Sequence, residues 1–351
     1  MITNGFIHFQ TYKQMYYTIS HIRLLFSTFK YIKHKTVLNF LKIIVSYLTS
    51  SVTRTKSLNT LPLFLSVEPA DFCQLSCPQC PVGASNKHKG HLFENKPFNS
   101  FLNQQKSSLF HLIFYFQGEP TLNKNLPEMI LKAHQSKIFT STSTNGQAIN
   151  SDMARSLVES GLDKIIVSID GATQNVYQLY RVGGKLEKAT QSIVLINYWK
   201  KQLKKTSPFV ELQFVVFKTN EHEIDKIKRM AKELKVNKLT FKSAQIYETE
   251  KCDELMSTIN KYARYKKNID GSFSIKQKQP NRCFRLWSGG VLNVKGEVLP
   301  CCFDKNGEHS FGNINDSDFN FVYNNSKANK FRKSILQNRL QHTICRNCTS
   351  H

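Results

Sequence analysis

Short apolar runs alternate with amphipathic stretches through the middle of the chain. Runs rich in β-branched and aromatic residues predict six strands, at 62–67, 111–116, 137–143, 164–169, 209–217 and 238–242. Between them, apolar residues recur every three or four positions and predict helices, among them 125–135, 151–161, 186–202 and 221–235. This alternation predicts an α/β fold with a parallel sheet and crossover helices, either an open doubly wound sheet or a partial barrel.

The first four predicted strands end in sequence that suits a ligand site. Three cysteines follow the first strand, and the next three strands run into QGEP (117–120), STNG (143–146) and SIDG (168–171). Asn-Gly and Asp-Gly are common turn sequences, so none of these stretches is informative alone. The carboxyl ends of parallel strands meet at one edge of a sheet, however, and we expect a binding site where the four stretches come together.

The first 67 residues form a separate compositional zone. They contain no Asp or Glu and eight basic residues, namely Lys13, Arg23, Lys30, Lys33, Lys35, Lys42, Arg54 and Lys56. The apolar run 36–52 carries Asn39 and Lys42 and is too short to span a bilayer comfortably. Nor does it resemble a secretory signal. We predict a basic helical extension over 1–60, with one or two amphipathic helices in 17–50 that pack on the domain; peripheral contact with a membrane is the alternative.

Composition narrows the class of protein. The chain has 351 residues, 40% of them hydrophobic, which is enough for one large core or two smaller ones. Nine cysteines cluster by spacing, which favours metal ligation in a reducing, cytoplasmic compartment over a disulfide framework. The net charge of +24 suits an anionic partner. We interpret the lysines of 198–205 and 244–282 as solvated, and expect no nucleic-acid partner because no recognised nucleic-acid fold accompanies them.

The cysteine loop leaves more than one kind of site open. Cys73, Cys77 and Cys80 supply three thiols in Cys-x3-Cys-x2-Cys spacing. A structural zinc needs four ligands, and only His88 and His91 are near in sequence, at a loose gap. Three thiolates would instead hold a four-iron cluster with one iron open, and thiolates suit iron–sulfur centres.

Several motifs, taken in order, resemble the core of the radical S-adenosylmethionine (SAM) enzymes. They are the cysteine loop, Gly118-Glu119-Pro120, TNG at 144–146, VSIDG at 167–171 and Tyr180-Arg181, within a core predicted at 61–243. The resemblance implies a partial (β/α)6 barrel and a [4Fe-4S] cluster on Cys73, Cys77 and Cys80 whose fourth iron is chelated by SAM. One-electron reduction would then cleave SAM to methionine and a 5′-deoxyadenosyl radical, which abstracts hydrogen from a substrate.

The same resemblance assigns residues to the SAM site. It implies that SAM is held by Gly118, Glu119, Pro120, Ser143, Asn145, Ser168, Asp170 and Arg181. The chain departs from the family pattern at Gln117, where the family has glycine, and at Gln79, where many members have an aromatic residue that shields the adenine. The strand edge and the adenine contact are therefore the parts of the site that the resemblance defines least.

The tail carries a second set of cysteines. The set consists of Cys283, Cys301, Cys345 and Cys348. Gly296 stands five residues before Cys301, and Gly312-Asn313-Ile314 lies between Cys301 and Cys345. This pattern resembles the SPASM-type auxiliary domain that follows radical SAM cores. Without that context the spacing would favour zinc. The resemblance places this domain at 283–351 with one auxiliary [4Fe-4S] cluster. We assign Cys301 as the ligand and Cys302 as the spare, predict a polar linker over 244–282, and interpret Cys252 in it as structural.

The resemblance implies an enzyme of oxidoreductase type or one that matures a peptide. We expect a peptide or protein side chain as substrate and a one-electron donor such as flavodoxin or ferredoxin. The alternatives are the same chemistry on a small molecule, such as an aminosugar or nucleotide, and a non-catalytic iron–sulfur or zinc protein that transfers electrons or acts as a scaffold. No catalytic side chain is assigned.

Overall fold

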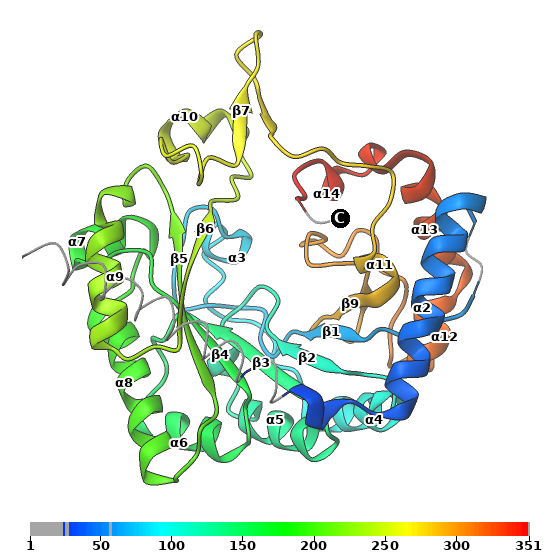
Figure 1. Cartoon of the computed structure of the whole chain (residues 1–351), viewed down its shortest axis with the longest axis horizontal. Coiled ribbons are helices and arrows are strands. Elements are labelled where there is room, and N and C mark those ends of the chain that lie inside the picture. The colour runs from blue at the N-terminus through cyan, green and yellow to red at the C-terminus, as the bar shows by residue number, and fades with distance from the viewer. Residues whose placement is uncertain (1–23, 25–27, 56–57, 350–351) are drawn as a thin grey trace, which may run out of the picture.

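A curved, mostly parallel sheet organises the molecule (Figure 1). The computed structural model describes residues 24, 28–55 and 58–349. The eight strands lie in the order β10-β9-β1-β2-β3-β4-β5-β6. Their bounds are Phe64–Val67 (β1), His111–Phe114 (β2), Phe139–Thr144 (β3), Lys164–Ser168 (β4), Phe209–Val216 (β5), Lys238–Ser243 (β6), Gly289–Leu292 (β9) and Val298–Leu299 (β10). The prediction of an α/β fold with a partial barrel is confirmed, and each of the six predicted strands is present.

Helices cover the outer face of this curved sheet (Figure 1). They are α4 (Asn95–Gln105), α5 (Leu126–Gln135), α6 (Ser151–Glu159), α7 (Gln174–Tyr180), α8 (Leu186–Gln202) and α9 (Ile224–Glu233, after η3, Glu221–Glu223). Helix α6 begins where the Asn150 side chain accepts a hydrogen bond from the Met153 amide, and it buries Ala154, Leu157 and Val158. One apolar face per helix therefore meets the buried side chains of the strands.

The tail of the chain extends the same sheet. Strand β9 pairs in parallel with β1, with Phe64 opposite Gly289 and Val67 opposite Leu292, and β10 pairs antiparallel with β9. Helices α11 (Arg285–Ser288), α12 (Phe319–Asn324), α13 (Ser326–Asn338) and α14 (Thr343–Arg346), with η5 (Arg339–Gln341), complete this region. The cysteine-rich tail is thus attached to the core through a sheet edge, which the sequence did not predict.

The segment 244–282 has elements of its own. It contains η4 (Thr249–Lys251), α10 (Cys252–Leu255) and an antiparallel hairpin of β7 (Tyr265–Lys267) and β8 (Phe273–Ile275), which projects away from the sheet (Figure 1). Cys252 is fully buried in a small apolar cluster with Phe217, Ala244, Ile246 and Tyr265. Its position fits a structural role.

The basic N-terminal zone contains a long helix, α2 (His34–Thr53), preceded by η1 (Phe29–Tyr31). Tyr47 of α2 makes edge-to-face contacts with Phe284 and Trp287, at centroid distances of 5.2 and 5.6 Å. Helix α2 therefore packs on the start of the tail region, as the predicted extension would. Of the predicted helical stretch 17–50, residues 17–23 and 25–27 lie outside the described residues. The helix extends beyond the apolar run 36–52, which the sequence predicts to be too short for a span: within the described residues, α2 alone is long and apolar enough to cross a membrane, by length and composition.

Candidate active site

The three cysteines of the first set lie in the loop between β1 and the short helix α3 (Pro81–Ala84). Backbone hydrogen bonds fix this loop: the Cys73 amide donates to Lys87 O at 3.1 Å, and the Cys80 amide donates to Cys77 O at 3.1 Å. Helix α3 packs closely on it, because a Cβ at Gly83 would lie 2.5 Å from the Cys77 nitrogen. A glycine is therefore required there.

Three polar side chains reach the thiols of this loop, and one of them, Gln74, accepts a hydrogen bond from Cys73 Sγ at 3.6 Å through its Oε1. Asn145 Nδ2 lies 3.3 Å from Cys73 Sγ, and Arg181 Nη1 lies 4.0 Å from Cys77 Sγ. Burial raises the pKa of Cys73 to about 12. Burial also raises the pKa of Cys77, although Arg181 opposes this. Both thiols therefore carry protons at neutral pH, and a bound metal would have to displace them.

The nearby histidines do not support the zinc alternative, because their Nδ1 atoms contact oxygen atoms of the protein. His88 Nδ1 lies 2.9 Å from Cys73 O, and His91 Nδ1 lies 3.2 Å from an Asp71 carboxylate oxygen. In the described part of the chain, no three or more His, Cys, Asp or Glu side chains are arranged to hold a metal ion. Zinc needs ligands that converge on one centre, whereas the thiolates of an iron–sulfur cluster bind different irons. The donor set of three thiols fits a cluster.

Gly118 allows the end of β2 to approach the cysteine loop. A Cβ at this position would lie 2.3 Å from Ala70 O and 2.6 Å from Phe72 O. The next amide, that of Glu119, donates to Phe72 O at 2.9 Å. Pro120 then starts the 3-10 helix η2 (Pro120–Leu122). The stretch 118–120 therefore lies directly against the loop that carries the cysteines.

The Glu119 carboxylate is buried and joins the ends of β2 and β3. Its Oε1 accepts from the hydroxyls of Thr121 and Thr144, both at 2.6 Å, and its Oε2 accepts from the Asn145 amide at 2.8 Å. Burial raises the pKa of Glu119, while these hydrogen bonds oppose the rise. The role of Thr144 was missed in the sequence, where the only signal is its place directly before Asn145-Gly146.

Asp170 and Arg181 form a buried ion pair at the end of β4. Arg181 Nε donates to Asp170 Oδ2 at 2.6 Å, and the side chains are 15% and 0% exposed. Asp170 Oδ1 also accepts from the Val215 amide at 2.7 Å, which fixes the carboxylate to β5. Burial alone would lower the pKa of Arg181. The neighbouring Asp170 and Cys77 have the opposite and larger effect, so the pKa of Arg181 is raised. Arg181 therefore lies as a fixed cation beside Cys77.

The two remaining SAM-site residues lie near the ends of neighbouring strands. Ser143 is half-buried in β3 and pairs in register with Ile166, whereas Ser168 is the buried last residue of β4. The fold thus brings the residues of four strand ends to one edge of the sheet, as expected. Their contacts with SAM remain predictions.

The tail cysteines come from separate segments. Cys283 precedes α11, Cys301 and Cys302 follow β10, and Cys345 and Cys348 lie in and after α14. Burial raises the pKa of the Cys301 thiol, and the neighbouring Cys302, Cys283 and Cys345 raise it further. Burial raises the pKa of Cys345 to about 11. The set is therefore gathered in one region around Cys301.

Two arginines lie within hydrogen-bonding distance of thiols in this region. Arg339 Nη2 lies 3.2 Å from Cys348 Sγ, and Arg285 Nη1 lies 3.2 Å from Cys302 Sγ. Cys302, which the sequence analysis predicts to be the spare thiol, thus has a cationic partner of its own. No feature of the sequence indicates this contact. The choice of Cys301 as ligand remains a prediction.

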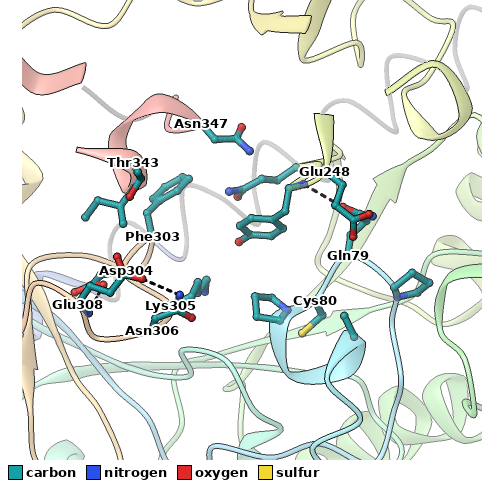
Figure 2. A pocket seen from close by; sticks show the side chains of 16 residues that line it. Gln79, Cys80, Glu248, Phe303, Asp304, Lys305, Asn306, Glu308, Thr343 and Asn347 are labelled. Carbon is teal, nitrogen blue, oxygen red and sulfur yellow. Dashed lines mark hydrogen bonds between the residues drawn. The ribbon is translucent and has the colours of Figure 1, made fainter. Parts of the chain in front are cut away.

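A pocket of about 340 Å³ lies between the two cysteine regions (Figure 2). One wall carries Cys80 and Gln79, whose Oε1 accepts from the Tyr247 amide at 3.0 Å. The facing wall comes from the tail and includes Lys305, whose Nζ lies 4.5 Å from the Phe116 ring centroid. Burial lowers the pKa of Lys305. Among the described residues that line the pocket, Lys305 alone is cationic, and no pattern in the sequence indicates this role for it.

Comparisons with known proteins agree with this arrangement. Residues 67–231 match the radical SAM superfamily, and residues 283–349 match the SPASM iron–sulfur cluster-binding domain. The chain is 22% identical over 283 residues to the PqqA peptide cyclase of Bradyrhizobium diazoefficiens, covering 76% of this chain and 71% of the relative.

Two of the solved structures that share the fold illustrate the similarity. SuiB of Streptococcus suis bound to precursor peptide SuiA gives a TM-score of 0.58 at 15% identity, covering 81% of this chain and 69% of SuiB. BtrN in complex with AdoMet and 2-DOIA gives a TM-score of 0.51 at 19% identity, covering 84% of this chain and 95% of BtrN. The chain therefore belongs to the radical SAM superfamily and carries a SPASM-type iron–sulfur cluster-binding domain at residues 283–349.

Proposed function

We propose that the protein abstracts hydrogen from a peptide or protein side chain. Membership of the superfamily makes the chain an enzyme with a [4Fe-4S] cluster and SAM as cofactors, and its SPASM domain binds auxiliary iron–sulfur clusters. When bound and reduced, the first cluster and SAM supply a 5′-deoxyadenosyl radical. In the proposal Cys73, Cys77 and Cys80 hold this cluster. The observation that carries it is the gathering of these thiols, Gly118 and Arg181 at one sheet edge.

The polar residues of the sheet edge would orient SAM. Asn145 is fixed by Glu119 and lies against Cys73, which supports a place for it beside the cofactor. Arg181 is held by Asp170 next to Cys77, so its charge is available to an anionic group of the cofactor. Ser143 and Ser168 would line the same edge. These side chains are positioned before the cofactor binds, which reduces the ordering cost of binding.

For the tail, we propose one auxiliary cluster on Cys283, Cys301, Cys345 and Cys348. Four protein thiolates leave no open iron for substrate, so the role would be electron transfer or structural support. A Cys345→Ala variant separates these roles. It is expected to lose one cluster's worth of iron and most turnover. Loss of the iron with full turnover would leave the auxiliary cluster a structural role alone.

A peptide substrate is supported by similarity and by geometry. The chain is similar to a peptide cyclase, and the pocket beside Cys80 has a wall from each cysteine region, so a side chain placed there would lie next to the first cluster. A small molecule such as an aminosugar or nucleotide is the second candidate. The pocket volume of about 340 Å³ falls within the range of small-molecule sites.

The substrate class can be tested with reconstituted protein. Candidate peptides, aminosugars and nucleotides are added with SAM and a reductant, either dithionite or a flavodoxin or ferredoxin system, and 5′-deoxyadenosine is followed by chromatography. A peptide is expected to raise its rate of formation above the substrate-free rate and to lose hydrogen or change in mass. Stimulation by the sugars or nucleotides alone would overturn the peptide assignment.

A further inference from the structure

One face of α2 presents apolar side chains to solvent. Val37, Leu38, Leu41, Val45, Leu48 and Val52, called here the apolar face of α2, recur every three or four residues and are all exposed. Exposure reaches 54% at Leu41, 58% at Leu48 and 83% at Val52. A contiguous exposed apolar stripe of this length marks an interaction surface in a folded protein.

The opposite face of α2 is firmly attached to the protein. Asn39 exchanges hydrogen bonds with the Leu61 backbone, at 2.8 Å to its carbonyl and 3.2 Å from its amide. Tyr47 packs on Trp287, and Arg54 Nη1 donates to Leu336 O at 2.7 Å. Crossing a bilayer would break all of these contacts, whereas lying on a surface would break none. The helix is therefore suited to contact a flat partner with its outer face only.

The charges beside the apolar face have one sign. Lys35 and Lys42 are exposed, and within the described residues neither forms an ion pair. No Asp or Glu occurs anywhere from Met1 to Val67, so no acidic side chain of the segment opposes them. By contrast Lys30 is engaged, at 3.7 Å from Asp163. An apolar stripe flanked by unpaired cations is complementary to a surface with an apolar interior and anionic headgroups.

We propose that α2 docks the enzyme on an anionic phospholipid surface. The apolar face of α2 enters the boundary between headgroups and acyl chains, while Lys35 and Lys42 contact the headgroups. The contact does not depend on the proposed substrate, and it would hold the catalytic pocket at a fixed orientation to the membrane because α2 packs on the tail region. It extends the protein's function to recruitment at a membrane.

Vesicle binding by the full chain tests the apolar contribution. The protein is pelleted with vesicles of phosphatidylcholine, with and without added phosphatidylglycerol. Wild type is expected to bind the anionic vesicles, and a Leu41→Asp/Leu48→Asp double variant to lower the partition coefficient by more than about tenfold. The matched control is Leu131→Asp/Val194→Asp, two exposed apolar residues of α5 and α8, which should bind as wild type does. Equal binding by the two double variants would overturn the proposal.

Charge is tested separately. A Lys35→Glu/Lys42→Glu variant is expected to lower binding to anionic vesicles by about fivefold or more per residue, and salt should weaken wild-type binding in the same direction. The control is Lys188→Glu/Lys201→Glu, which makes the same charge change on exposed residues of α8. An equal loss in both variants would mean that net charge, and not this surface, binds the vesicle.

Two further measurements decide which partner covers the apolar face of α2. Sedimentation equilibrium would show whether Leu41→Asp/Leu48→Asp converts a dimer into a monomer; if so, a second copy covers the face and the proposal is wrong. If the protein neither dimerises nor binds vesicles, the remaining candidate to cover the apolar face of α2 is the chain's own N-terminal segment. That result would also overturn the proposal. In Leu48→Trp, which retains an apolar side chain, the fluorescence should shift to the blue on anionic vesicles and be quenched by brominated lipid. No shift would contradict the proposal.

Discussion

Glu119 is the residue on which the alignment of two strand ends depends. Its carboxylate accepts from Thr121, Thr144 and Asn145, so Glu119→Gln would place amide hydrogens opposite at least one of these donors. We expect the free energy of unfolding to fall by roughly 1–3 kcal/mol and SAM affinity to weaken. Urea denaturation and calorimetry with SAM measure the two effects.

The control for this prediction is Glu128→Gln on α5. Glu128 is exposed and pairs with Lys132 one turn along the helix, so its loss should cost about 0.5 kcal/mol or less. Equal effects of the two substitutions would show that the Glu119 network does not support the site.

Glu68 should make the stability of the protein depend on pH. Its Oε2 accepts from the Val294 amide at 3.2 Å, its Oε1 has no partner among the described residues, and burial raises its pKa to about 7 from 4.5. The folded state thus keeps this proton to higher pH than the unfolded state. The free energy of unfolding should therefore fall, by up to roughly 3 kcal/mol, as the pH rises from about 4.5 to about 7.

A Glu68→Gln variant removes this dependence. It should be more stable than wild type at pH 8, and the difference should shrink towards pH 5, where the wild-type carboxyl is already protonated. Urea denaturation of both proteins across this range is the measurement. Parallel pH profiles would show that Glu68 ionises normally in the folded protein.

At the scale of single residues, the sequence identified motif positions but not their partners. Gly118 and Asp170 stand out by their place after strands, and Arg181 stands out as part of the Tyr180-Arg181 motif. Gln74, which donates to Asn145 Oδ1 at 3.2 Å, and Arg285 beside Cys302 do not. Such contacts join residues far apart in the chain, and no local pattern of hydrophobicity or spacing encodes them.

Among the elements, the segment after β2 and the cysteine loop are in close contact at Gly118. Gly118→Ala places a methyl group 2.3 Å from Ala70 O, so the strand end and the loop must separate. We expect less iron per protein after reconstitution and weaker SAM binding. Iron analysis and calorimetry measure this.

The control for Gly118→Ala is Gly271→Ala in the turn of the β7–β8 hairpin. Gly271 has a φ of +81° and open space around it, so the alanine strains the backbone without touching either cysteine set. It should lower stability modestly and leave iron content unchanged. Equal iron loss in both variants would attribute the effect to general destabilisation.

Elements were predictable where a local pattern specified them. The strand predicted at 164–169 is β4 at Lys164–Ser168, and the helix predicted at 186–202 is α8 with the same bounds. Strands β9 and β10 were not predicted, because both are short, β9 begins with two glycines, and the sheet edge forms only when β9 pairs with the distant β1 and β10 pairs with β9. Residues 244–282 looked polar along their whole length, yet a few buried side chains such as Ile246 and Tyr265 are enough to fold them.

The whole molecule places two cysteine sets around one pocket. The sequence predicted both sets from the spacing of the cysteines, and it predicted the parallel fold from the alternation of apolar runs with amphipathic stretches. It did not predict the pocket between them, whose walls come from the cysteine loop, the end of the sheet and the tail. This arrangement depends on how β9 attaches the tail to β1, a property of the tertiary structure alone.

The central claim is that Cys73, Cys77 and Cys80 hold a cluster that lets the protein cleave SAM. The most direct measurement is 5′-deoxyadenosine formation by anaerobically reconstituted, dithionite-reduced protein, together with metal analysis, for wild type and Cys77→Ala. Wild type is expected to contain iron and to release 5′-deoxyadenosine and methionine, and Cys77→Ala to release neither. Zinc in the loop of wild type, or a reduced iron-loaded protein that leaves SAM intact, would contradict the account.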